Sequence, residues 1–165
     1  MMRATILLIE DDRSTASALE KVLENEGYAV KVVERGDEGL REAREQPYDL
    51  VITDLRMPGL SGLDLVGQLH TAKPKLPIIM MTAHGTTETA IEAMKLGAYD
   101  YLVKPFDPDE LSMMMQKIVA QQALARENAL LRQALKRDYR FRDLVSKSPA
   151  MRQVFELART AARST

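Results

Sequence analysis

Five short apolar runs, each followed by a stretch with helical periodicity, constrain the fold of this chain more than any other feature. The first run, Thr5–Glu10, is continuously apolar until it ends in acid, and Ser14–Glu26 then has apolar residues at helical spacing. The alternation continues through predicted strands at Ala29–Val33, Leu50–Thr53, Pro77–Met81 and Tyr101–Val103, and helices at Gly36–Glu45, Leu63–His70 and Thr87–Leu96. Five such repeats predict an α/β fold, in which helices cover both faces of a parallel sheet.

A long helical segment is predicted after the last strand. Asp107-Pro108 is typical of a helix start, and neither glycine nor proline follows until Pro149. Within this segment, residues at 3–4 spacing form the stripe of a short coiled coil; they are Gln121, Leu124, Asn128, Leu131 and Leu135. We expect the stripe to be a dimer linker, and the alternative is a helix that folds back on its own domain. A further helix is expected at Met151–Arg163.

Charge divides the chain into two parts. Residues 1–125 carry a net charge of −7 and residues 126–165 a net charge of +6, although the whole chain is at −1. We expect a domain at 1–120, a helical linker at 121–143 and the start of another domain at 144–165. The basic tail could serve as a nucleic-acid arm through Arg126, Arg132, Lys136, Arg137, Arg140 and Arg142. A solvated helix surface is favoured instead, because aromatic residues are few.

Composition excludes several classes of protein. The chain has no cysteine, which excludes a disulfide scaffold, a zinc-thiolate site and a cysteine nucleophile. It has only two histidines, so we do not expect a histidine-rich metal centre. The apolar runs are far shorter than the ~20 residues that a membrane helix needs. We therefore expect a cytoplasmic protein without a membrane segment.

Side chains of complementary chemistry follow four of the predicted strands. Ligands of open α/β sheets bind at the carboxyl ends of the strands, and there the sequence has Glu10, Asp11, Asp54, Thr82 and Lys104. Carboxylates that converge need a cation between them, and oxygen ligands suit Mg²⁺. An aspartate, a divalent cation, a lysine and a hydroxyl around one point predict a site that accepts a phosphoryl group. The alternative, acids that only cap helices, would not explain all four strand ends.

These residues lie in blocks that resemble the receiver domain of bacterial two-component response regulators. The resemblance covers residue 4 to about 120, and its blocks are Leu7–Asp12, Asp54–Gly59 with Gly62, Met81–Ala83 and Gly97–Phe106. It implies a flavodoxin-like, doubly wound five-stranded parallel sheet of order 2-1-3-4-5 with the helical linker as a C-terminal extension. The phosphoryl donor implied is a sensor histidine kinase.

The resemblance also implies roles for individual residues. Asp54 would be the phosphoacceptor, and Lys104 would contact the phosphoryl group, with a cis peptide before Pro105. Glu10 and Asp11 would hold Mg²⁺ together with Asp54 and the backbone carbonyl of Arg56. Because Glu10 stands where the family more often has aspartate, Asp12 could share the metal role. Thr82 and Tyr101 would form a switch pair that responds to phosphorylation.

Further blocks resemble the nitrogen-regulatory, NtrC-type branch of this family. They include Thr82–Gly85, Arg126–Leu131 and Leu144–Met151. The branch implies a homodimer through the receiver and linker helix, and a downstream ATPase domain that activates sigma-54 RNA polymerase. No GxxxxGK[ST] phosphate loop occurs in the sequence, so we expect a chain that is not an enzyme and contacts DNA and polymerase only through domains beyond Thr165. An aspartyl-phosphate phosphatase of similar topology is the alternative function, although its nucleophile would follow the first strand.

Overall fold

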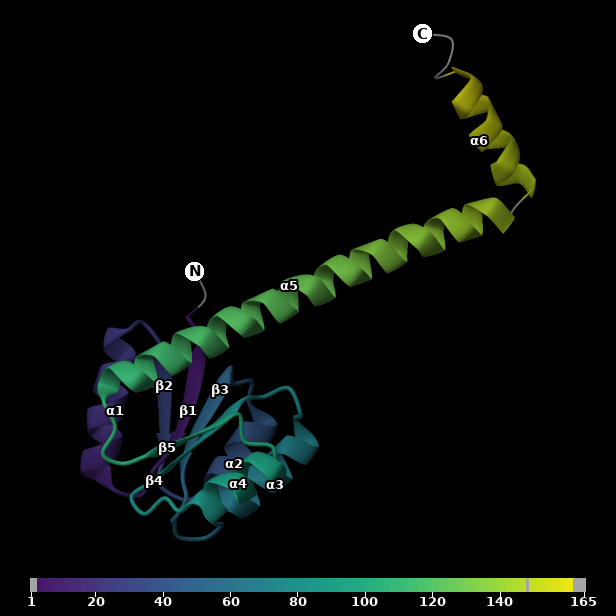
Figure 1. The fold of residues 1–165 in the computed structure, drawn as a ribbon. Helices are drawn as coiled ribbons and strands as arrows, with labels where there is room; N and C mark the ends of the chain where they lie inside the picture. The colour runs from purple at the N-terminus through teal and green to yellow at the C-terminus, as the bar shows by residue number, and fades with distance from the viewer. Residues whose placement is uncertain (1–2, 148, 162–165) are drawn as a thin grey trace. The chain divides into compact units, whose positions relative to one another are not determined.

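The computed structural model describes residues 3–147 and 149–161, in which strands and helices alternate (Figure 1). The chain divides into two units, residues 1–120 and the residues from 121 onward, and each is described by itself. The elements of the chain are β1 (Thr5–Ile9), α1 (Arg13–Asn25), β2 (Ala29–Val33), α2 (Gly36–Glu45), β3 (Leu50–Asp54), α3 (Gly62–Ala72), β4 (Ile78–Thr82), α4 (Thr87–Leu96), β5 (Asp100–Val103), α5 (Pro108–Lys147) and α6 (Pro149–Ala161).

The five strands form one sheet in the order β2-β1-β3-β4-β5, and each adjacent pair is parallel. The predicted fold class and strand order are therefore confirmed. The predicted boundaries differ by one or two residues: Glu10 lies just beyond β1, whereas Asp54 and Thr82 are the last residues of β3 and β4. All five residues of β3 and of β4 are buried, as expected of central parallel strands.

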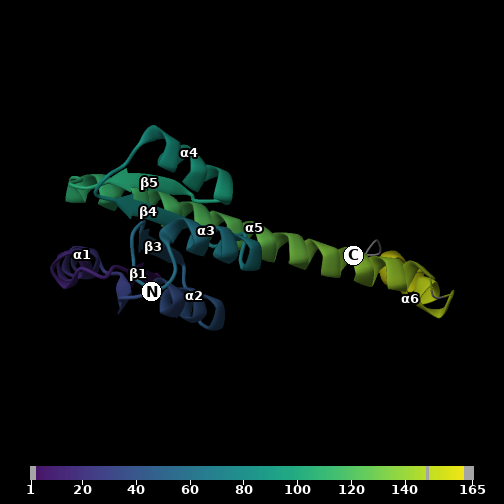
Figure 2. The same ribbon diagram turned by 90° about the horizontal axis from the view of Figure 1, so that it is seen from below.

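Helices cover both faces of the sheet and enclose two apolar cores (Figure 2). Successive residues of a strand point to opposite faces, so Leu7 and Ile9 enter the core beneath α2, α3 and α4. Ile6 and Leu8 enter the other core, which α1 closes together with the first turns of α5. The apolar run of β1 thus fills both cores at once, which explains why it shows no polar alternation.

Local sequence sets where several helices begin and end. Asp12 is the N-cap of α1, because its carboxylate accepts the backbone N–H of Thr15 at 2.7 Å. Ser61 caps α3 in the same way. The helix α4 ends at Gly97, whose φ of +110° lies in the left-handed region that favours glycine. These caps satisfy backbone groups that the helix itself leaves without partners.

The second unit contains the part of α5 from residue 121 onward, and α6. The leucines of the predicted stripe are exposed along α5: Leu124 is 65% exposed, Leu131 59% and Leu135 57%. The predicted dimer and the boundary at residue 143 remain predictions. The expected helix Met151–Arg163 corresponds to α6, although Arg163 lies outside the described residues, as do the side chains of Arg140 and Arg142. Within the described residues, no helix has the length and apolar character needed to span a membrane.

Two glycines of the first unit, Gly27 and Gly97, share a positive φ but differ in the space around them, so they provide a matched test of side-chain packing. Gly27 (φ +94°) has open space where a Cβ would lie, whereas a Cβ on Gly97 would overlap the imidazole ring of His70. Gly27→Ala should lower the free energy of unfolding by about 1 kcal/mol, through backbone strain alone. Gly97→Ala should lower it by about 2–4 kcal/mol, because overpacking adds to the strain. Urea titrations measure both values, and equal losses would show that the contact with His70 carries no cost.

Candidate functional site

The carboxyl ends of β1, β3, β4 and β5 meet at one edge of the sheet. Asp54 of β3 is in register with Met81 of β4, and Thr82 in turn with Val103 of β5. Glu10 follows β1 directly and continues its ladder by donating its N–H to Val33 at 3.0 Å. The structure therefore brings together side chains that lie far apart in the sequence.

Lys104 links two of the carboxylates. Its Nζ donates to Glu10 Oε2 at 2.6 Å and lies 3.3 Å from Asp54 Oδ1. The lysine side chain is only 20% exposed, and that of Glu10 only 1%. The peptide bond before Pro105 is cis, as the resemblance implied. Such a partly buried ion pair gains strength from the lower local dielectric.

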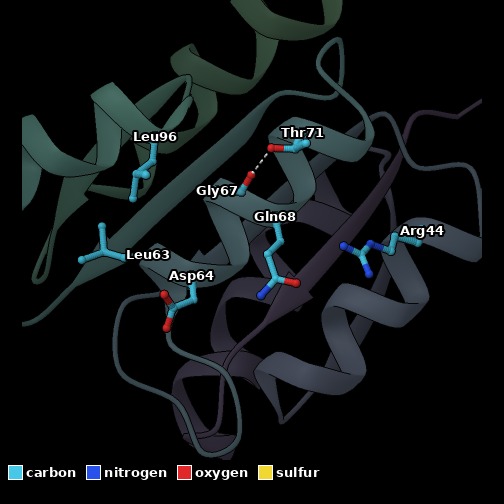
Figure 3. Close-up of a pocket in the computed structure, with 7 residues that line it drawn as sticks. All are labelled: Arg44, Leu63, Asp64, Gly67, Gln68, Thr71 and Leu96. Atoms are coloured by element: carbon cyan, nitrogen blue, oxygen red, sulfur yellow. Dashed lines mark hydrogen bonds between the residues drawn. The ribbon is translucent and has the colours of Figure 1, made fainter.

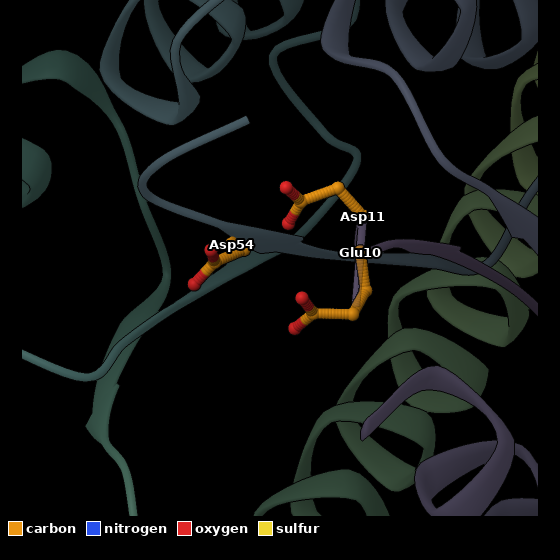
Figure 4. Close-up of side chains that lie close together, drawn as sticks. All are labelled: Glu10, Asp11 and Asp54. Carbon is orange, nitrogen blue, oxygen red and sulfur yellow. The ribbon is translucent and has the colours of Figure 1, made fainter. Parts of the chain in front are cut away.

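Glu10, Asp11 and Asp54 each direct a carboxylate into the same space (Figure 4). One oxygen from each lies within 4.8 Å of the others. Three carboxylates with one nearby ammonium leave a surplus of negative charge, and the donors are all oxygen. The donor set is that of a site for a hard divalent cation.

Burial and charge shift the pKa values of the ion pair. Burial raises the pKa of Glu10, and the opposing hydrogen bonds from Lys104 and from the Asp12 N–H do not cancel this effect. Burial alone would lower the pKa of Lys104, but the hydrogen bond to Glu10 and the charge of Asp54 outweigh it and raise that pKa. Lys104 is therefore held in its charged form next to Asp54.

The two remaining candidates for the metal role, Asp12 and the backbone carbonyl of Arg56, lie at exposed residues. Asp12 is exposed and caps α1, and the backbone hydrogen bond from Thr15 lowers the pKa of its carboxyl. It is not a member of the carboxylate cluster found among the described residues. Arg56 is exposed in the loop between β3 and α3. The metal roles of Asp12 and of the Arg56 carbonyl remain predictions.

Glycines hold the loop that carries Arg56, and their roles were not foreseen from the sequence. A Cβ on Gly62 would overlap the backbone carbonyl of Asp54, and one on Gly36 would overlap that of Leu60. Gly36 also donates its N–H to Pro58 at 3.2 Å. The close approach keeps the loop beside Asp54. The sequence signals for these positions were the block Asp54–Gly59 with Gly62, and the place of Gly36 at the start of a helix.

The two predicted switch residues form hydrogen bonds with different parts of the chain, Thr82 with the connection at residues 83–86 and Tyr101 with helix α4. Thr82, 3% exposed, accepts the backbone N–H of His84 at its hydroxyl oxygen at 3.2 Å. Tyr101 is half-buried, and its hydroxyl lies 3.0 Å from the hydroxyl of Thr89 on α4. Thr89 was not a predicted site residue. The Thr86-x-x-Thr89 spacing at a helix start is the signal that could have drawn attention to it.

A shallow groove of about 420 Å³ lies over α3 (Figure 3). None of the predicted site residues lines it in the described structure; its lining consists of Arg44, Leu63, Asp64, Gly67, Gln68, Thr71 and Leu96. Thr71 is bonded within α3, to the carbonyl of Gly67 at 2.9 Å. The chemistry of the chain is therefore concentrated at the strand ends and not in this groove.

The structure thus defines an α/β domain with five parallel strands whose carboxyl ends carry acids and a lysine. The family model for the response regulator receiver domain matches residues 6–116, and the chain belongs to this family. The resemblance drawn from the motifs is thereby confirmed.

Similar proteins are transcriptional regulators of the NtrC type. The chain is 39% identical over 115 residues to the transcriptional regulatory protein ZraR of Escherichia coli K12, covering 70% of this chain and 26% of that protein. It is 33% identical to the DNA-binding transcriptional regulator NtrC of the same organism, over all of this chain and 34% of that protein. A crystal structure of NtrX from Brucella abortus matches with a TM-score of 0.71 and 32% identity, over 79% of this chain and 30% of that one. The chain thus spans about a third or less of the length of these curated relatives.

Replacing Lys104 should make stability depend more strongly on pH. A folded pKa of Glu10 above its ordinary 4.5 means that the stability contributed by this group is present below pH 4.5 and lost as the pH rises through the folded value. Lys104→Met removes an interaction that lowers this pKa, so the loss on raising the pH should be greater. We expect Lys104→Met to lower the free energy of unfolding by about 1–3 kcal/mol at pH 7, and by less near pH 4.5.

Urea titrations at the two pH values measure this difference, with Lys117→Met on the exposed side of α5 as the control. The control should cost less than ~0.5 kcal/mol at both values. A cost for Lys104→Met that is the same at pH 4.5 and pH 7 would contradict the assigned partnership with Glu10.

Proposed function

We propose that the chain is the phospho-accepting receiver of a two-component relay, and that Asp54 takes a phosphoryl group from a sensor histidine kinase. The single observation that carries the proposal is the position of the Lys104 ammonium, 2.6 Å from Glu10 and 3.3 Å from Asp54. A partly buried lysine beside two carboxylates at the strand ends brings a cation next to a nucleophile, the carboxylate of Asp54. Membership of the receiver family supports the same assignment.

In the proposed step, an Asp54 carboxylate oxygen forms a bond to phosphorus while the P–N bond of a phosphohistidine breaks. The imidazole leaves with the electron pair of that bond and takes up a proton. Lys104 then pairs with a phosphoryl oxygen, because its donors are free to leave a carboxylate for a more highly charged partner. The chain assists the reaction at its own aspartate and does not act on a separate substrate.

Mg²⁺ fits the donor set, since three carboxylates face one ammonium and every candidate ligand is oxygen. Glu10, Asp11 and Asp54, with the backbone carbonyl of Arg56, would hold the ion. When bound, it supplies positive charge that stabilises the phosphoryl oxygens. Because Glu10 is also the hydrogen-bond partner of Lys104, the metal and the lysine would share this buried carboxylate.

Phosphorylation would act on the switch pair. A phosphoryl group on Asp54 offers acceptor oxygens to the Thr82 hydroxyl, which now accepts the His84 N–H at 3.2 Å. Movement of Thr82 would vacate space for the ring of Tyr101. The face formed by α4 and β5 would then change shape and carry the signal.

Downstream, the signal would control a cytoplasmic transcription activator of the NtrC type. The exposed leucines of α5 would pair two chains, and such a pair would hold the receivers side by side. Contacts with DNA and sigma-54 RNA polymerase would not be made by this chain. They would be made by regions equivalent to the part of the relatives that the chain does not span.

Phosphorylation can be tested with a small phosphodonor. Acetyl phosphate with Mg²⁺ should add one phosphoryl group that hydroxylamine removes, and EDTA should prevent the addition because the carboxylates need the cation. Intact mass spectrometry measures the product.

The matched variants are Asp54→Asn and Asp64→Asn. Asp64 is exposed on the first turn of α3, outside the carboxylate cluster, so its replacement should leave labelling unchanged. Asp54→Asn should abolish labelling, and equal labelling of this variant would end the assignment of the acceptor.

Assembly can be tested on the stripe of α5. Burial of each leucine against a second chain contributes roughly 1.5–3 kcal/mol, so we expect residues 1–165 to be dimeric. Leu131→Asp with Leu135→Asp should give a folded monomer, because two charges would enter the interface. Light scattering measures the mass in solution.

Ala129→Asp with Gln133→Asp is the control for this variant. These positions lie on the outer side of the heptad and receive the same two charges, so the dimer should persist. A monomeric parent, or a dimer that survives both leucine substitutions, would remove the stripe from the interface.

A further inference from the structure

The four residues between β4 and α4 are held at both ends by side-chain hydroxyl groups. At the first end, Thr82 accepts the N–H of His84 at 3.2 Å. At the other end, Thr86 and Thr89 form a reciprocal capping box. The Thr86 N–H donates to Thr89 Oγ1 at 3.1 Å, and the Thr89 N–H donates to Thr86 Oγ1 at 3.2 Å.

The hydroxyl of Thr89 connects this capping box to β5. A threonine hydroxyl has one hydrogen and two lone pairs. Thr89 gives its hydrogen to the carbonyl of Thr86 at 3.0 Å, so the Tyr101 hydroxyl, also at 3.0 Å, is the donor in the bond between the two side chains. Tyr101 therefore completes the hydrogen bonding of the residue that caps α4.

The connection leaves little spare room around the ring of Tyr101. A Cβ on Gly85 would lie 3.2 Å from the Tyr101 hydroxyl and 2.6 Å from Val103 Cγ2. The glycine backbone thus closes over the outer edge of the tyrosine ring. Because the Tyr101 hydroxyl is bonded to Thr89, a turn of the ring would end this link between β5 and the first turn of α4.

Helix α4 depends on its cap more than the other helices of the sheet do. Of its ten residues, all of them described, only Ala93 is buried, whereas α1 buries three residues and α2 and α3 four each. A helix with little tertiary packing opens locally at low cost. Loss of one hydrogen bond at the N-terminus of α4 should therefore increase the rate at which the amides of its first turn exchange.

We propose that Thr89 is a positioning residue that couples the ring of Tyr101 to the N-terminus of α4. While Tyr101 donates to Thr89, the capping box is complete; when the ring turns inward, Thr89 loses that donor and the first turn of α4 loosens. The inference rests on the proposed function in one respect, that phosphorylation of Asp54 is what moves Thr82 and Tyr101. Thr82 holds one end of residues 83–86 directly and Tyr101 holds the other end through Thr89, so a single event would release the connection at both ends.

Amide hydrogen exchange of the unphosphorylated chain, followed by NMR, tests the coupling. The reporters are the amides of Thr89 and Ala90, which donate to the side chain and carbonyl of Thr86. Tyr101→Phe removes only the hydroxyl and should make both amides exchange roughly 2- to 10-fold faster. Tyr48→Phe is the control, because the hydroxyl of Tyr48 donates to Glu42 of α2 at 2.7 Å and its loss should leave α4 unchanged.

A double-mutant cycle separates coupling from simple loss of stability. Thr89→Val should accelerate the Ala90 amide, and Tyr101→Phe added to it should have no further effect. Thr89→Ser keeps the hydroxyl and should restore the exchange rate of the parent. Additive effects, or no rescue by serine, would overturn the proposal.

Phosphorylation with acetyl phosphate separates this proposal from the proposed function. The phosphorylated parent should show the faster exchange of the Tyr101→Phe variant, and that variant should not respond further. A parent that is phosphorylated but keeps its original exchange rates at Thr89 and Ala90 would overturn the role of Thr89. A parent that fails to be phosphorylated would instead refute the proposed function, while the coupling measured without phosphodonor would stand.

Discussion

The parallel pairing of all five strands is the constraint on which the rest of the structure depends. Because every strand runs in the same direction, the carboxyl ends of β1, β3, β4 and β5 meet at one edge. The helices that return the chain must cover both faces, so the central strands are buried and apolar. The central strands β3 and β4 carry no charged side chain before their last residue, so the acids and the lysine gather at the strand ends.

The acidic side chains at the strand ends repel one another and need positive charge close by. Glu10 is almost fully buried, and its carboxylate is tolerable in this place because Lys104 donates to it at 2.6 Å. One ammonium does not balance three carboxylates, which leaves the site suited to a further cation. In the proposed function, Lys104 would exchange a carboxylate for a phosphoryl oxygen, so the ion pair that stabilises the folded chain would also take part in the chemistry.

Helix α5 shows how one element takes two environments. Its first turns bury Leu111, Met115 and Ile118 in the core beside α1. Beyond residue 120, Leu124, Leu130, Leu131 and Leu135 are exposed on the same helix, which extends to Lys147. Helical propensity and the absence of glycine and proline suffice to continue the helix. What covers the exposed stripe depends on a second surface, which the helix alone does not specify.

The sequence by itself determined the strands, their parallel direction and the residues at the strand ends, because periodicity and contiguous motifs are local properties. The strand order came only from the resemblance to the receiver family. The sequence also indicated the family, through blocks such as Asp54–Gly59. Only the tertiary structure decided that Asp12 caps α1, that Lys104 is mostly covered and bonds Glu10 94 positions away, and that Thr89 meets Tyr101. The physical reason is that hydrogen-bond partners and burial depend on how packed elements face one another, and neither spacing nor composition records those orientations.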